Sequence, residues 1–223
     1  MKRITLKNTL LTALLIVAFT GNAFAAKQNV TAPDGFETVK TRQLDNAWVN
    51  PEFNPKDYET VVVKWGNFDY KPAKKFYGHQ RILNDNFELA AWAKVKMQDD
   101  AHTEFAKTLA KVDDFKLIDI EEADQRTMSV NLTLTDIVNH VPNTMGVGGR
   151  YDVYVRDFGA MTLNVEFTDL TTGELLFKGN VRETVEARGV DFERATPFLA
   201  AHQTKWRLKR WATGLEKGLD KMK

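Results

Sequence analysis

The stretch GAMTLNVEFTDLTTGELL, residues 159–176, predicts a β-hairpin and decides the fold class. In its first half, polar residues alternate with Met161, Leu163, Val165 and Phe167, a pattern typical of a strand with one buried face. Residues 169–174 then have the composition of a turn, in which Gly173 is suited to a positive φ. The chain returns in a second strand, whose buried face is expected to contain Leu175, Phe177, Val181 and Val185.

Three further segments are expected to be strands. Residues 60–65 (TVVVKW) are rich in β-branched side chains, which indicates a short buried strand. Residues 115–120 (FKLIDI) predict a second strand, and residues 128–135 (MSVNLTLT) alternate apolar and polar side chains as a half-buried strand does. Residues 151–158 fit either a strand or a loop.

Two regions have the apolar spacing of helices. Residues 86–112 place most of their apolar side chains on one stripe, although Asp99 or Asp100 could cap a second helix within this region. Residues 198–222 are expected to form a long helix, preceded by Thr196 as a cap and Pro197 in the first turn. The apolar stripe of this last helix consists of Leu208, Trp211, Ala212, Leu215, Leu219 and Met222.

The order strand, helix, four strands, helix predicts an α+β fold in a single domain. We expect a mainly antiparallel sheet of about five strands, one β-α-β unit and a long C-terminal helix packed on one face. The domain is expected to span residues 58–223. Residues 26–57 carry three prolines and read as an extended arm, although Trp48 and Phe53 suggest that parts of it lie against the domain.

The first 25 residues have the pattern of a secretory signal peptide. Three cationic side chains precede the apolar run at residues 10–19, which is about half the length of a membrane-spanning helix. The sequence Ala23-Phe24-Ala25 fits a cleavage site, so we expect a mature chain that starts at Ala26 in the periplasm. An uncleaved anchor is the alternative. The chain has no cysteine, which excludes disulfides, thiolate catalysis and acylation of a cysteine after the signal.

The charge balance argues against a nucleic-acid-binding protein. The chain has 31 basic and 30 acidic residues, and loss of the signal leaves 28 against 30, a net charge of −2. The charges are unevenly spread. Residues 113–124 contain six acidic residues and one lysine, whereas most charged side chains of the last helix are basic. Trp206 falls outside the apolar stripe of that helix, so either the arm covers it or it is an exposed aromatic beside cations. The candidate interaction surface consists of Trp206, Arg207, Lys209, Arg210 and Lys217.

Four stretches carry a resemblance to a known family. They are PDGF at residues 33–36, DNAWVNPEFNPKDYETVVV at 45–63, LTLTDI at 132–137 and the hairpin at 159–176. In this order, they resemble domain-of-unknown-function family 3313, a group of bacterial envelope proteins, many of them lipoproteins. The resemblance implies an envelope location and an α+β fold. It supplies no catalytic residue, and this chain departs from the family in lacking the lipoprotein cysteine.

No catalytic or metal-binding motif is present in the sequence. Ser129 is the only serine and does not lie in a nucleophile elbow. The four histidines show no spacing typical of a zinc site, and the glycine-rich residues 145–151 lack the features of a phosphate-binding loop. No cofactor is implied, and carboxylate-based hydrolysis stays open because two acidic residues can converge in a fold.

Three functions follow, in order of preference. The first is a non-enzymatic binding or assembly protein of the bacterial envelope whose partner is another envelope protein. The second is a peripheral binder of lipid or lipopolysaccharide that uses the basic C-terminal helix. The third is a carboxylate-dependent hydrolase.

Overall fold

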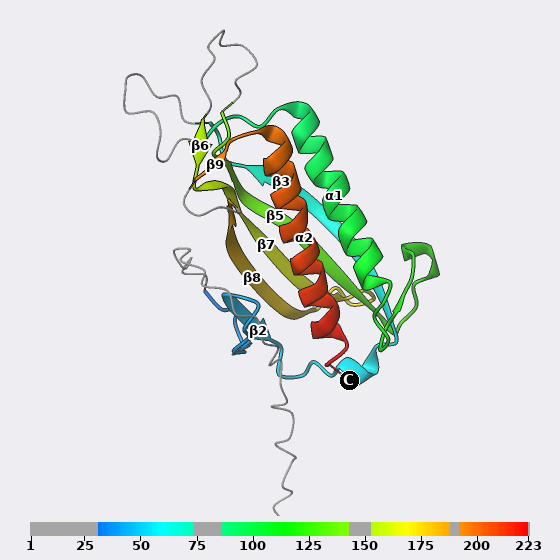
Figure 1. Ribbon diagram of the computed structural model, residues 1–223. Helices are drawn as coiled ribbons and strands as arrows, with labels where there is room; N and C mark the ends of the chain where they lie inside the picture. The colour runs from blue at the N-terminus through cyan, green and yellow to red at the C-terminus, as the bar shows by residue number, and fades with distance from the viewer. Residues whose placement is uncertain (1–30, 74–85, 143–152, 188–191, 223) are drawn as a thin grey trace, which may run out of the picture.

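In the computed structural model, which describes residues 31–73, 86–142, 153–187 and 192–222, two helices lie on one face of a twisted sheet (Figure 1). The sheet has seven strands in the order β1-β2-β8-β7-β5-β3-β4. These strands are β1 (Glu37–Thr38), β2 (Asn46–Val49), β3 (Thr60–Tyr70), β4 (Lys116–Leu117), β5 (Thr127–Asn139), β7 (Asp157–Asp169) and β8 (Leu175–Glu186). The helices are α1 (Ala91–Leu109) and α2 (Pro197–Leu219). A separate two-stranded sheet joins β6 (Tyr154–Val155) and β9 (Glu193–Arg194).

The expected α+β class is confirmed. Strand β3 runs parallel to β4 and β5, and the other neighbours in the main sheet are antiparallel, so α1 is the crossover of a β-α-β unit. The sheet has two strands more than the five expected, because β1 and β2 form within the segment expected as an arm. Strand β2 pairs with β8 over four residues, too few for an alternating pattern to be read from the sequence.

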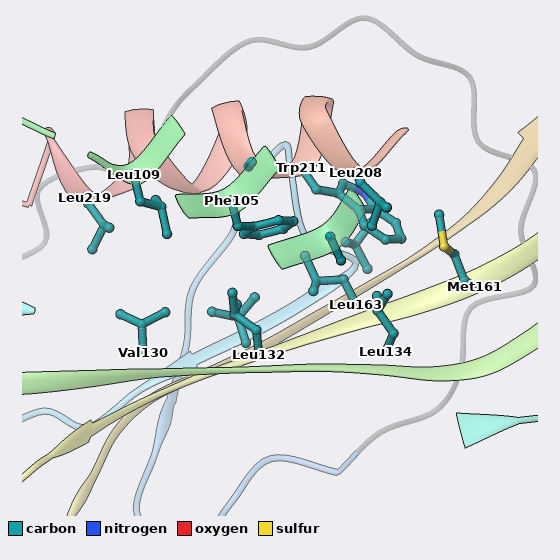
Figure 2. Close-up of a cluster of buried hydrophobic side chains, with 14 of the residues drawn as sticks. Phe105, Leu109, Val130, Leu132, Leu134, Met161, Leu163, Leu208, Trp211 and Leu219 are labelled. Carbon is teal, nitrogen blue, oxygen red and sulfur yellow. The ribbon is translucent and has the colours of Figure 1, made fainter. Parts of the chain in front are cut away.

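The predicted hairpin is confirmed as β7 and β8, with Phe167 opposite Phe177 and Gly173 in the turn at a φ of 74°. Side chains from β5 and β7 point toward both helices and form the centre of the core (Figure 2). The core residues labelled there are Phe105, Leu109, Val130, Leu132, Leu134, Met161, Leu163, Leu208, Trp211 and Leu219. The helices therefore cover only one face of the sheet, as predicted.

The last helix begins as its sequence predicts. Pro197 occupies the first turn of α2, and the Thr196 hydroxyl accepts a hydrogen bond from the backbone N–H of Leu199. Helix α1 is one continuous helix, so of the two alternatives for this region the single helix is correct, and no second helix begins at Asp99 or Asp100. It also begins five residues later than expected, since Asn86 and Phe87 instead bond to strand ends. The Asn86 amide bridges Lys71, Pro72 and Asn139, and the Phe87 N–H donates to the Asn139 carbonyl.

Two shorter predictions differ in extent. Of residues 115–120, only Lys116–Leu117 form a strand, because the next residues turn into a 3₁₀ helix, Ile120–Glu122. Of residues 151–158, Tyr154–Val155 form β6 and Asp157 begins β7, so the described part of this segment is mostly strand. The predicted signal peptide at residues 1–25 and the glycine-rich residues 145–151 both lie outside the described residues.

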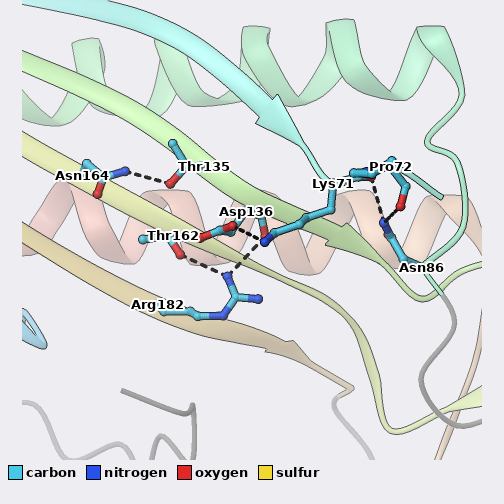
Figure 3. Close-up of polar contacts among 8 residues, drawn as sticks. All are labelled: Lys71, Pro72, Asn86, Thr135, Asp136, Thr162, Asn164 and Arg182. Atoms are coloured by element: carbon cyan, nitrogen blue, oxygen red, sulfur yellow. Dashed lines mark hydrogen bonds and ion pairs between the residues drawn. The ribbon is translucent and has the colours of Figure 1, made fainter. Parts of the chain in front are cut away.

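The sheet face opposite the helices carries a polar network (Figure 3). The guanidinium of Arg182 donates to the Thr162 hydroxyl and to the backbone carbonyl of Asp136. The Asp136 carboxylate pairs with Lys71 at 2.6 Å, and Asp136 itself has a φ of 52°. This residue lies where the pairing of β5 and β7 is interrupted by a bulge. An aspartate tolerates that left-handed backbone better than most residues, and its two partners hold the bulge in place.

The turn between β7 and β8 is held by one carboxylate. The side chain of Asp169 accepts hydrogen bonds from the backbone N–H groups of Thr171 and Thr172 and from the hydroxyl of Tyr58. Burial alone would raise the pKa of Asp169, but these hydrogen bonds outweigh it and lower that pKa.

We expect Asp169→Asn to lower the free energy of unfolding by about 2 kcal/mol at neutral pH, because three hydrogen bonds to a charged acceptor are weakened. The pKa of Asp169 is lower in the folded protein than its unfolded value of about 3.9, so its negative charge stabilises the folded state. This stabilisation is complete at a pH well above about 3.9. That contribution is lost as the pH falls through the folded pKa. Urea unfolding of both proteins from pH 7 to pH 2 measures this, and the two curves should converge in acid. A constant gap across this range would contradict the role of the charge.

Candidate ligand-binding cavity beneath helix α2

A cavity of about 380 Å³ lies between α2, the helix-covered face of the sheet, and residues 41–45. We call it the α2 cavity. Its lining is mixed, and the apolar part comes from side chains of β7, β8 and α2: Leu163, Val165, Phe167, Phe177, Val181, Trp211, Leu215 and Met222. The polar part, which is almost as large, includes Thr41, Arg42, Gln43, Asp45, Glu183 and Arg210. This size and mixture are typical of a site for a small molecule with both apolar and polar groups.

Glycines give the α2 cavity its room. Gly214 and Gly218 lie one turn apart on α2 and both line it. A Cβ atom at Gly214 would stand 3.3 Å from the side-chain oxygen of Gln43, so the segment approaches the helix closely there. On the sheet, a Cβ atom at Gly179 would lie 2.6 Å from the Leu44 side chain, which shows that Leu44 occupies the space this glycine leaves.

Residues 41–45 are fixed to the sheet at the Asp45 end. The Asp45 N–H donates to the Asn180 carbonyl at 2.8 Å, and the Asp45 carboxylate accepts from the Arg182 N–H at 2.8 Å. The Thr41 hydroxyl accepts from the Leu44 N–H and closes a local turn. One wall of the cavity is therefore a short, anchored loop, whereas the opposite wall is a helix.

Two buried donors belong to the lining of the α2 cavity. Trp211 is only 6% exposed, and its indole Nε1–H has no hydrogen-bond acceptor among the described residues. The side-chain nitrogen of Gln43 is also buried and has no hydrogen-bond acceptor among the described residues. Buried donors without partners are uncommon in folded proteins because each costs desolvation energy. Both nitrogens are covered by packed atoms, so neither faces the open space of the α2 cavity.

The carboxylates of the lining are already engaged. Glu183 forms an ion pair with Arg207, whose second guanidinium nitrogen also donates to the Thr184 carbonyl at 3.0 Å. Asp45 accepts from the Arg182 N–H, as described above. Both acidic side chains of the lining therefore have hydrogen-bond donors within the protein.

The candidate surface from the sequence is divided by the structure. Trp206 is 43% exposed, with the guanidinium carbons of Arg207 and Arg210 at 5.5 and 5.9 Å from its ring centre. Of the two alternatives for Trp206, the structure therefore shows the exposed aromatic beside cations. Lys209 and Lys217 are also exposed. Arg207, however, is only 8% exposed, because it turns inward to Glu183, so it does not belong to that surface. Arg210 also lines the α2 cavity.

A smaller cleft of about 150 Å³ lies between the N-terminal ends of the two helices and the sheet. Trp92, which is 52% exposed, lines it. Phe198, at 79% exposed, is the second residue of α2, whose first residue Pro197 also lines the cleft. The α2 cavity is the larger of these two spaces, which is why we take it as the candidate site.

The sequence predicted helix α2 but not the cavity beneath it. Trp211 was assigned to the apolar stripe, correctly, and the residues of the loop at 41–45 were part of the expected arm. The available signal was the pair Gly214 and Gly218 within an otherwise strongly helical segment, since a helical glycine costs stability and often marks a close approach.

We expect Gly214→Ala to raise the free energy of unfolding by about 0.5–1 kcal/mol, because alanine favours the helix and the nearby end of the Gln43 side chain can move. Thermal unfolding measures the change. A loss of stability would mean that Gln43 cannot yield, and that the loop is held more rigidly than its contacts indicate.

Within residues 31–73, 86–142, 153–187 and 192–222, no helix is long and apolar enough to cross a membrane. In the same part of the chain, no three histidine, aspartate or glutamate side chains converge as metal ligands would.

Comparisons with known proteins reveal only distant similarity. No protein-family model and no curated protein matches the chain, so the resemblance to family 3313 is not supported. Many solved chains are similar in part, among them three from different bacteria. A dodecamer of a PelC variant from Paraburkholderia phytofirmans is 10% identical, covers 76% of this chain and 94% of its own, and has a TM-score of 0.34. Protein XCC0632 from Xanthomonas campestris, described as belonging to the uncharacterised family 330, is 10% identical. It covers 75% of this chain and 86% of its own, with a TM-score of 0.36.

The third structure is a homologue of neuraminyllactose-binding hemagglutinin from Helicobacter pylori, at 8% identity, 74% and 81% coverage, and a TM-score of 0.33. At these scores the likenesses carry no argument about the activity or the ligand of this chain.

Proposed function

We propose that this protein is a non-enzymatic binding protein of the bacterial cell envelope, and that the α2 cavity is its ligand site. The observation that carries the proposal is a cavity of about 380 Å³ with apolar side chains from β7, β8 and α2 on one side and the polar residues 41–45 on the other. The signal-like N-terminus supports the location in the periplasm. The partner expected from the sequence was another envelope protein, whereas a cavity of this kind favours a small molecule or a single chain of a lipid.

Native mass spectrometry of the protein isolated from its own cells tests this proposal. We expect the wild-type protein to carry an added mass from a bound molecule. The variant Val181→Phe places a ring in the α2 cavity, because Val181 is a buried residue of its lining, and it should lose the added mass.

The matched control is Val62→Phe, a change of the same size on β3 at a buried position outside the cavity lining. It should keep the added mass if it remains folded. Circular dichroism of each variant verifies the fold. Bare wild-type protein, or added mass that survives in folded Val181→Phe, would overturn the proposal, and a co-purifying protein subunit would favour the original protein-partner hypothesis.

A second candidate function is the binding of anionic lipid by the outer side of α2. It is favoured by the exposure of Trp206 and by Arg210 beside its ring. The variant Trp206→Ala with Lys209→Glu should lose binding to vesicles that contain anionic lipid, whereas Arg207 stays unchanged because it is structural. Unchanged vesicle binding by this folded variant would remove the candidate.

A further inference from the structure

We infer that the outer edge of strand β3 is an interface between two copies of this chain, in which the β3 strands pair antiparallel across a two-fold axis. The inference goes beyond the proposed function and does not depend on it, because the α2 cavity is lined from β7 and β8, on the far side of β5 from this edge. It follows from the unpaired length of the edge, the direction of its backbone groups and the match between its side chains.

Strand β3 has a long edge without a neighbour. The strand has 11 residues and pairs with β5 from Thr60 to Tyr70, but it pairs with β4 only at Thr60 and Val61. Among the described residues, no strand and no backbone hydrogen bond continues the β4 side of β3 from Val62 to Tyr70. An edge of this kind presents donors and acceptors with which another strand can pair.

The ladder fixes which residues turn their backbone groups toward the open edge. The Ile118 N–H donates to the Val61 carbonyl from the β4 side, whereas the Lys71 N–H donates to the Ile137 carbonyl on the β5 side. Backbone groups of successive strand residues point to alternate edges, and the extra residue of β3 at 66–67 shifts this alternation by one. The residues whose N–H and C=O groups point outward are therefore Val63, Trp65, Phe68 and Tyr70.

This order is self-complementary. When Trp65 lies opposite Phe68 of a second copy, Val63 lies opposite its Tyr70, so outward groups meet outward groups as hydrogen-bonded antiparallel pairs require. The bulge at residues 66–67 then lies at the two-fold axis and faces its own counterpart. Trp65 and Phe68 already stack within one chain, with ring centres 5.6 Å apart, and both are only half-buried. The second copy therefore extends an existing aromatic cluster.

The same register brings opposite charges together. It places Lys64 opposite Asp69 of the second copy, twice across the axis, on the sheet face away from the helices. Within the described part of the chain, neither side chain forms an ion pair. Opposite charges that face each other across two strands stabilise their pairing, and like charges weaken it. A shift of the second copy by two residues would instead set Lys64 against Lys71.

Cysteine crosslinking tests the interface and its register, because the chain has no cysteine of its own. Residues 64 and 69 form a non-hydrogen-bonded pair in this register, with Cα atoms about 4.5 Å apart, which suits a disulfide. We expect the double variant Lys64→Cys with Asp69→Cys to become a covalent dimer on mild oxidation. The matched control, Lys64→Cys with Lys71→Cys, corresponds to the shifted register and should stay uncrosslinked.

Sedimentation equilibrium of the full mature chain tests the charge pairs. We expect the wild-type protein to dimerise reversibly, and Lys64→Asp or Asp69→Lys to raise the dissociation constant at least about tenfold, because two attractive pairs become repulsive. An equal mixture of the two variants should restore dimers, since every pair across the axis again joins opposite charges. Circular dichroism verifies that each variant is folded.

Three results would overturn the inference. The first is wild-type protein that is monomeric at every concentration, and the second is a dimer whose dissociation constant neither charge variant changes. The third is equal crosslinking of the double variant and its control. A wild-type monomer that co-purifies with another polypeptide, lost in folded Lys64→Asp, would assign the edge to that partner and also overturn the pairing of two copies.

Discussion

Replacing Arg207 by methionine is expected to lower the free energy of unfolding by about 3–5 kcal/mol, because it leaves Glu183 buried without its counter-charge. Arg207 and Glu183 are both nearly covered, and the guanidinium also donates to the Thr184 carbonyl. The pair joins α2 to β8 next to the α2 cavity. Urea unfolding at neutral pH measures the loss.

The double variant Arg207→Met with Glu183→Met is the control. Removing both charges leaves no unpaired group, so most of the lost stability should return. A surface arginine would behave differently, because exposed ion pairs contribute at most about 1 kcal/mol. A small effect of Arg207→Met would therefore contradict the burial of this side chain and restore it to the outer surface of α2.

The variant Gly159→Ala is expected to be destabilised by more than about 3 kcal/mol or to fail to fold. Gly159 has a φ of 141°, and a Cβ atom there would lie 2.0 Å from the backbone carbonyl oxygen of Val138. Relief of this clash requires a shift of β5 or β7, which form the centre of the sheet. Thermal unfolding or the yield of folded protein measures the effect.

The matched control is Gly66→Ala on β3. Its Cβ atom would meet the Thr133 methyl group at 3.2 Å, and a side chain can yield where a backbone cannot. We expect at most about 1 kcal/mol of change there. Equal effects at the two glycines would contradict the assignment of the Gly159 effect to a backbone clash.

The sequence predicted the fold well wherever a long periodic pattern was present. Strands β5 and β7 each alternate apolar and polar side chains over eight or seven residues, 128–135 and 161–167, and α2 has both an apolar stripe and a cap at Thr196. Strand β2 was missed because four residues are too few to show a pattern, and its pairing with β8 depends on residues more than a hundred positions away. The start of α1 was misplaced for a similar reason, because the Asn86 side chain bonds to distant backbone groups.

The candidate site was the least predictable part. A tryptophan in an apolar stripe reads as a core residue, and Trp211 is one, yet its N–H group has no acceptor among the described residues. The inward turn of Arg207 was equally hidden, because a helical wheel gives the direction of a side chain but not the presence of Glu183 across the interface. Cavities and ion pairs between elements depend on tertiary packing, which periodicity does not encode.

The central claim is that the α2 cavity holds a bound molecule, and native mass spectrometry of the protein isolated from its own cells tests it most directly. We expect the wild-type protein and folded Val62→Phe to carry an added mass that folded Val181→Phe has lost. Wild-type protein without an added mass, or an added mass that survives in folded Val181→Phe, would contradict the account.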